Sequence, residues 1–204
     1  MFHVKHEGWA GAARSLGIEL TGLQVRQLER YEGLLRERAL PLGMIAHADA
    51  GRLRERHLLD SLRAATVIEP DDANAYDLGS GAGLPGIVLA VACPGLQVRL
   101  VESRRPRGAF LELVAGELSL TNVRVLVQRV GTLSEPADLC LSRAFRDVRK
   151  AWAAAEYLLV PGGRLVYFAG EGFDPASAPE GVPVDIRAFP SLARSGPLVI
   201  MTRQ

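Results

Sequence analysis

The feature that most constrains the fold is a glycine-rich turn between a strand pattern and a helix pattern. Residues 74–78 have the length and apolar content of a short buried strand, and residues 85–92 form an apolar run that opens with a proline suited to a first helical turn. Between them lie Gly79, Gly81 and Gly83. Glycine permits positive φ and a close approach of a ligand to the main chain, and a helix N-terminus offers free N–H donors. The pattern therefore predicts a strand–turn–helix unit that binds a ligand.

The rest of the chain alternates between strand and helix patterns. The predicted strands after the turn lie at 97–102, 123–128, 138–142 and 164–169, with predicted helices at 106–119 and 147–158. Two further strands, at about 182–189 and 197–202, have no helical pattern between them and are expected to form an antiparallel hairpin. This order is typical of an α/β, Rossmann-like fold with a mostly parallel, doubly wound sheet.

The segment before the glycine turn has a helical pattern. Leucines recur at three- and four-residue spacing over 7–39, and a similar pattern covers about 50–67. We expect residues 1–68 to form an N-terminal helical extension and 69–204 a Rossmann-like domain. The two should make one compact unit, because a chain of 204 residues supports one sizeable core and is short for two full domains. The proline- and glycine-rich segment 172–183 is the expected mobile loop.

The composition indicates the cellular compartment and limits the kinds of binding partner that we expect. The sequence has no apolar run of the roughly 20 residues that cross a bilayer and no signal-peptide pattern, so we expect a cytoplasmic protein. Cys93 and Cys140 lack metal-ligand spacing, and no metal is expected. A net charge of +1 gives no long-range attraction to nucleic acid, yet arginines cluster at 52–56, 104–107 and 143–149. Each cluster is either a set of phosphate contacts or a solvated face.

Acidic residues near the turn distinguish two classes of ligand. Gly81, Gly83 and Gly86 match the Gly-x-Gly-x-x-Gly spacing of a dinucleotide site, whereas Asp77 and the glycines after it match the acidic-x-Gly-x-Gly-x-Gly turn with which methyltransferases bind S-adenosylmethionine. A carboxylate there would repel a pyrophosphate but could accept from an ammonium group, which favours the second class. Helix capping is the alternative role of Asp77. Glu102, after the next strand, could accept from both ribose hydroxyls in either class.

Four motifs resemble one family. The sequence contains RHLLDSL at 56–62, DLGSGAGLPGIVLA at 77–90, FLELV at 110–114 and SRAF at 142–145. In this order and spacing they resemble the glucose-inhibited division protein B family, methyltransferases that act on guanine N7 of small-subunit (16S) ribosomal RNA. The resemblance implies the class I methyltransferase form of the fold, S-adenosylmethionine as cofactor, and 16S ribosomal RNA or the small ribosomal subunit as partner.

The resemblance also implies individual site residues. It implies cofactor contacts at Gly79 and Leu84 in the turn, at Val130 and Gly131 after the third strand, and at Arg143 within SRAF. We hypothesise that Arg143 also positions the target base, a structural salt bridge being the alternative. With the residues named above, the predicted cofactor-binding set is Asp77, Gly79, Gly81, Gly83, Leu84, Glu102, Val130, Gly131 and Arg143.

The sequence departs from the family pattern on the target side. Ala169 stands where the family has a lysine, Gly196 stands near the place of a family arginine with Arg194 close by, and residues 43–45 replace Asn-Leu-Thr. Two roles are open for His57: a contact near the cofactor, or a structural link between the N-terminal helices and the sheet. A small-molecule methyltransferase of the same fold and a non-catalytic S-adenosylmethionine-binding protein therefore stay as alternatives.

Overall fold

The computed structural model describes residues 8–192 and 195–204, and its centre is a seven-stranded sheet in the order β3-β2-β1-β4-β5-β7-β6. Strands β1 to β5 run parallel to one another, whereas β7 is antiparallel to both β5 and β6. The strands are β1 (Asn74–Leu78), β2 (Gln97–Val101), β3 (Val123–Leu126), β4 (Ala137–Arg143), β5 (Leu159–Phe168), β6 (Val184–Arg187) and β7 (Leu198–Thr202). The predicted Rossmann-like sheet and its closing hairpin are confirmed.

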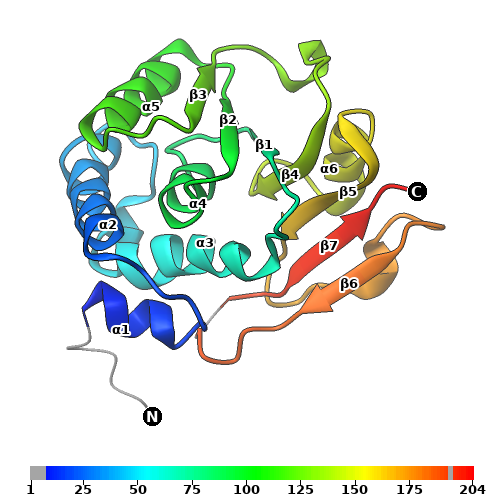
Figure 1. Ribbon diagram of the computed structural model, residues 1–204, viewed down its shortest axis with the longest axis horizontal. Coiled ribbons are helices and arrows are strands. Elements are labelled where there is room, and N and C mark those ends of the chain that lie inside the picture. The colour runs from blue at the N-terminus through cyan, green and yellow to red at the C-terminus, as the bar shows by residue number, and fades with distance from the viewer. Residues whose placement is uncertain (1–7, 193–194) are drawn as a thin grey trace.

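Helices cover both faces of this sheet (Figure 1). The crossover helices are α4 (Gly86–Ala92), α5 (Arg105–Glu117) and α6 (Val148–Ala155), and β3 is joined to β4 through only a short 3-10 turn, η5 (Val130–Thr132). A second 3-10 turn, η6 (Pro175–Ser177), lies in the segment predicted to be a loop. Alternate residues of β4 enter different cores, since Leu139 and Leu141 pack with α4 and α5 and Cys140 packs with α6.

The N-terminal segment is a series of short helices rather than one long one. It comprises α1 (Trp9–Arg14), α2 (Gly22–Leu34), η1 (Leu35–Ala39), η2 (His47–Arg52), η3 (Arg54–Leu59), α3 (Asp60–Leu62) and η4 (Arg63–Val67). The helical character predicted for 7–39 is present from Trp9 on, but it is divided because Gly17, at φ +76°, follows the end of the first helix and Thr21 caps the next. Thr21 Oγ1 accepts from the backbone N–H of Gln24, whose side chain accepts from Thr21 N–H in return.

These helices pack on the face of the sheet that α4 and α5 cover. Leu28, Tyr31 and Leu34 of α2 lie in one continuous apolar cluster with Ile87 and Leu111. The chain from α1 to η4 therefore buries apolar side chains against the crossover helices as well as between its own helices. No helix in the described part of the chain is long and apolar enough to span a membrane.

Candidate active site

The glycine turn has the backbone conformation that the sequence predicts. Gly79, Gly81 and Gly83 all have positive φ, at 76°, 57° and 95°. A Cβ on Gly79 would lie 2.4 Å from Cδ2 of Phe145, and one on Gly83 would lie 2.7 Å from Cγ1 of Ile87. At Gly79 and Gly83, both the positive φ and the lack of space for a Cβ therefore require glycine.

Asp77 lies beneath the turn, with 1% of its surface exposed. Its Oδ2 accepts a 3.1 Å hydrogen bond from the backbone N–H of Gly86, the first residue of α4. Burial raises the pKa of this carboxyl to about 7, although the hydrogen bond from Gly86 acts in the opposite direction. A Cβ on Gly86 would lie 2.7 Å from Oδ2, so this contact also needs glycine. In the structure, the carboxylate therefore interacts with the start of the helix.

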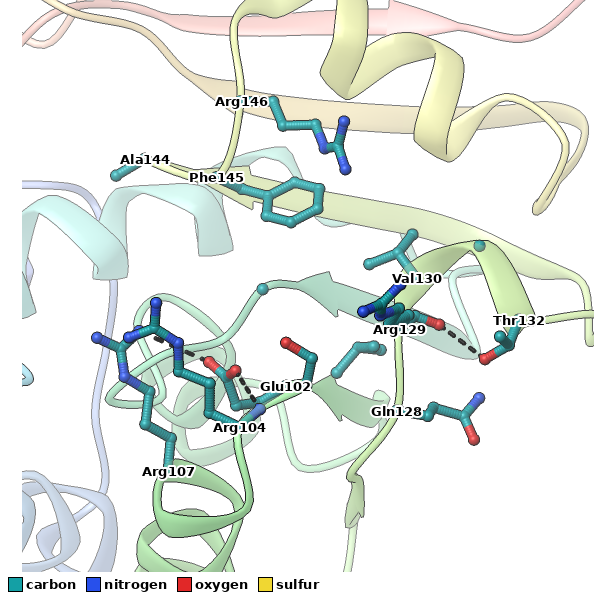
Figure 2. Close-up of a pocket in the computed structure, with 14 residues that line it drawn as sticks. Glu102, Arg104, Arg107, Gln128, Arg129, Val130, Thr132, Ala144, Phe145 and Arg146 are labelled. Carbon is teal, nitrogen blue, oxygen red and sulfur yellow. Dashed lines mark hydrogen bonds and ion pairs between the residues drawn. The ribbon is translucent and has the colours of Figure 1, made fainter.

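A cavity of about 780 Å³ opens where β1, β2, β3 and β4 end, and we call it the first cavity (Figure 2). Four residues of the predicted cofactor set line it: Gly79, Glu102, Val130 and Gly131. Gln128, Arg129, Phe145 and Arg146 line it as well, and they follow the ends of β3 and β4. The carboxyl edge of a parallel sheet is where such folds bind ligands. The volume lies within the roughly 300–1,000 Å³ usual for small-molecule sites.

Glu102 supplies the carboxylate in this cavity. Its Oε1 accepts a 2.8 Å hydrogen bond from the backbone N–H of Arg104, and its Oε2 lies 3.8 Å from Nη1 of Arg107 (Figure 2). An ionised carboxylate has about four acceptor positions, so these contacts leave room for a vicinal diol. Glu102 therefore fits the role of a ribose acceptor.

The rest of the predicted set lies around the first cavity but does not line it. Leu84 is 8% exposed and packs in the apolar core. A Cβ added to Gly81 would have Nη1 of Arg107 as its nearest neighbour, at a distance of 3.8 Å. Asp77, Gly83 and Leu84 therefore shape the turn from below, and Arg143 belongs to a neighbouring space.

That neighbouring space is a cavity of about 860 Å³, which we call the second cavity and which shares Ala144 with the first. Arg143, the last residue of β4, enters it from the sheet, and Asp49, His57 and Asp60 enter it from the N-terminal helices. Ala144 has φ +55°, so the chain turns sharply between the two cavities.

Arg143 is held by partners far away in the sequence. Its Nε donates a 3.0 Å hydrogen bond to Oδ2 of Asp60. Its Nη2 donates to the carbonyl oxygen of Arg56 at 3.1 Å and lies 3.0 Å from Nδ1 of His57. His57 therefore does link the N-terminal helices to the sheet, which is one of its two expected roles. The link is its contact with Arg143, the side chain proposed to position the target base.

Arg63 is a buried residue of the second cavity that no sequence motif singles out. It has no exposed surface, its Nη2 lies 2.9 Å from Oδ1 of Asp60, and its guanidinium lies 5.3 Å from the ring centres of Phe168 and Phe189. An arginine on a helix normally points to solvent, and this one is held inside by the ion pair with Asp60, by a hydrogen bond to the carbonyl oxygen of Gly196 and by the two phenylalanine rings. Its burial lowers its pKa.

Two of the positions that depart from the family pattern also lie here, whereas residues 43–45 do not line this cavity. Ala169 and Gly196 both line the second cavity. A Cβ on Gly196 would lie 2.3 Å from the carbonyl oxygen of Ala169, so a larger residue would not fit there. Arg194 lies outside the described residues.

Comparison with known proteins identifies the family. The family described as rRNA small subunit methyltransferase G matches residues 24–174, which is most of the chain. This range includes every residue that lines the first cavity and all those of the second except Ser195 and Gly196. The chain belongs to this family. The resemblance inferred from the four sequence motifs is therefore confirmed.

Members of the rRNA small subunit methyltransferase G family from distant bacteria are similar over nearly the whole chain. The ribosomal RNA small subunit methyltransferase G of Ralstonia nicotianae is 38% identical over 184 residues, which cover 85% of this chain and 82% of that protein. The protein of the same name from Mycobacterium leprae is 35% identical over 191 residues, covering 84% and 76%.

Solved structures with low sequence identity support the fold of this family member. A mutant of MtNAS in complex with S-adenosylmethionine superposes with a TM-score of 0.60 at 12% identity, covering 89% of this chain and 72% of that one. TYW2 of M. jannaschii in complex with AdoMet gives a TM-score of 0.54 at 13% identity, covering 72% and 75%. At such identities the likeness establishes the Rossmann-like methyltransferase fold alone.

Proposed function

We propose that this chain transfers a methyl group from S-adenosylmethionine to N7 of a guanine in 16S ribosomal RNA, as part of the small subunit. The observation that carries the proposal is the pair of adjoining cavities at the carboxyl edge of the sheet. One is lined by predicted cofactor contacts and the other contains Arg143. Membership of a ribosomal RNA methyltransferase family supports the substrate class. A ribosomal substrate would also place the protein in the cytoplasm.

In this proposal the first cavity holds the cofactor. Glu102 accepts from the ribose hydroxyls, the main chain at Val130 and Gly131 borders the adenine, and Gly79 borders the amino-acid part. Asp77 and the other glycines keep the turn in shape, since the Asp77 carboxyl accepts a hydrogen bond from the backbone N–H of Gly86.

The second cavity would receive the guanine. When bound, S-adenosylmethionine supplies a methyl group whose bond to sulfur breaks as its bond to nitrogen forms, the sulfur keeping the electron pair. Guanine N7 has a lone pair and carries no proton, so the protein needs no general base. Its contribution is to hold the ring in line, which can be worth on the order of 7 to 11 kcal/mol in favourable cases. Arg143 lines this cavity, and we assign to it the role of donor to the oxygen edge of the base or to a phosphate.

Two measurements, made one after the other, test the proposal. Calorimetric titration with S-adenosylhomocysteine tests the cofactor, and transfer of a radiolabelled methyl group to small subunits from a strain that lacks the gene tests the substrate. We expect both to be positive, with 7-methylguanosine as the labelled product in nuclease digests of 16S RNA. Binding without transfer to subunits would favour the small-molecule or non-catalytic alternative and would overturn the assignment to RNA.

Variants of two arginines test the second cavity. Arg143→Ala should keep binding of S-adenosylhomocysteine measurable but reduce transfer to subunits by about 100-fold, a loss in keeping with a positioning donor. Arg187→Ala is the matched control, since Arg187 is exposed on β6 and its side chain pairs with Asp185. Retained turnover in Arg143→Ala would remove Arg143 from the mechanism.

A further inference from the structure

The guanidinium of Arg143 is fixed through two of its three nitrogens. Asp60 accepts from Nε, and the Arg56 carbonyl and His57 accept from the two N–H bonds of Nη2. Within residues 8–192 and 195–204, Nη1 has no hydrogen-bond or ion-pair partner. Two N–H donors of Arg143, on a side chain that lines the second cavity, are therefore available to a ligand.

This arrangement fixes the protonation of His57. A guanidinium has no acceptor, so Nδ1 of His57 must present its lone pair to Nη2 of Arg143 across 3.0 Å. The proton of the neutral ring then lies on Nε2, which faces Oδ2 of Asp49 at 3.0 Å. Asp49 thereby selects the tautomer that Arg143 requires. A protonated ring would carry hydrogen on both nitrogens and could not accept from Arg143.

The charges around His57 also favour its neutral form. Three charged side chains face the ring: Asp49 from η2, Arg143 from β4 and Arg56 from η3. Burial and the charge of Arg143 lower the pKa of His57, and Asp49 acts in the opposite direction. Asp60 adds no direct contact with the ring, because its two oxygens pair with Arg143 and Arg63.

We propose that His57 is a positioning residue for methyl transfer: its neutral Nδ1 holds Nη2 of Arg143, so that Nη1 faces the target base. The inference rests on the proposed function of the second cavity. Its consequence is an acid limb in the rate profile. Below the pKa of His57 the ring gains a proton, the acceptor is lost, and an imidazolium is left facing a guanidinium at 3.0 Å.

The decisive measurement is the pH profile of kcat for methyl transfer to small subunits, in four variants and the wild type. His57→Asn puts a non-titrating oxygen near the position of Nδ1, so it should keep much of the wild-type kcat above neutral pH and lose the acid limb. His57→Leu offers no acceptor and should lower kcat by about 10-fold at every pH. Asp49→Asn removes the charge that raises the pKa of His57, so the acid limb should move to lower pH.

His47→Asn is the matched control. His47 is exposed in η2 and carries the same substitution on the same side of the fold, and its profile should superimpose on that of the wild type. A His57→Asn enzyme that keeps the wild-type acid limb, or a His57→Leu enzyme with wild-type kcat, overturns the role of His57. Absence of turnover in the wild type would instead overturn the proposed function, so the two failures are distinguishable.

Discussion

The hydroxyl group of Tyr31, in the N-terminal helix α2, donates a 2.7 Å hydrogen bond to the carbonyl oxygen of Ala82 inside the glycine turn. Tyr31 has no exposed surface, and its hydroxyl would lie 2.9 Å from a Cβ on Gly83. Burial raises the pKa of the phenol well above its ordinary value, so the group stays a donor across the physiological range. The N-terminal helices thus contact the main chain of the predicted cofactor site directly.

Tyr31→Phe should destabilise the protein and weaken cofactor binding. The change leaves the carbonyl of Ala82 without its buried donor, which typically costs about 1–3 kcal/mol. We expect a lower free energy of unfolding in urea and a higher Kd for S-adenosylhomocysteine. Tyr76→Phe is the control, because the Tyr76 hydroxyl donates to the Glu135 carbonyl at 3.2 Å, away from the turn. Equal Kd values for both variants would show that the hydrogen bond does not shape the site.

Asp77→Asn should change how stability depends on pH. The folded-state pKa of Asp77, about 7, lies above the ordinary carboxyl value, so the stability that its protonated form contributes is present in acid and is lost as pH rises through about 7. Asparagine does not titrate and can still accept from Gly86. The variant should therefore become more stable relative to the wild type with increasing pH, by up to about 4 kcal/mol, since one pKa unit is worth about 1.4 kcal/mol.

Urea unfolding of both proteins between about pH 4 and about pH 8 measures this difference. Asp71→Asn serves as the control, because Asp71 is exposed just before β1 and lies outside the turn. Parallel curves for Asp77→Asn and the wild type would contradict a raised pKa.

Glu102→Ala should weaken cofactor binding without abolishing the fold. Hydrogen bonds to a charged carboxylate are worth about 1.5–3 kcal/mol, so Kd for S-adenosylhomocysteine should rise roughly 10- to 100-fold by calorimetry. Glu112→Ala is the matched control, since Glu112 is exposed on the adjacent helix α5. An unchanged Kd in Glu102→Ala, with an unchanged melting temperature, would remove Glu102 from the cofactor site.

The features that could be predicted from the sequence are those that neighbouring residues determine. The glycine turn follows from residues within ten positions of one another, and the sheet follows from alternating patterns that the strand pairing confirms. Arg143 is different, because its partners Asp60 and His57 lie 83 and 86 residues away in the chain. No local pattern specifies that contact, nor the burial of Arg63 between two phenylalanines. The target side of the site therefore required the tertiary structure.

We propose that residues 1–68 and 69–204 unfold as one cooperative unit, because the apolar residues of α1 and α2 share one core with α4 and α5. Two buried tryptophans report on the two ends: Trp9 in α1 and Trp152 in α6.

Single-tryptophan variants make this testable. Trp152→Phe leaves Trp9 as the fluorescent reporter, and Trp9→Phe leaves Trp152. In each variant the urea transition followed by fluorescence should coincide with the transition followed by far-UV circular dichroism, as two-state unfolding requires. If the fluorescence of Trp9 changed at a lower urea concentration than the circular dichroism of the same variant, the N-terminal helices would be a separate unit that docks on the sheet. The hydrogen bond from the Tyr31 hydroxyl to the Ala82 carbonyl would then form only after docking, and the conformation of the glycine turn would depend on that step.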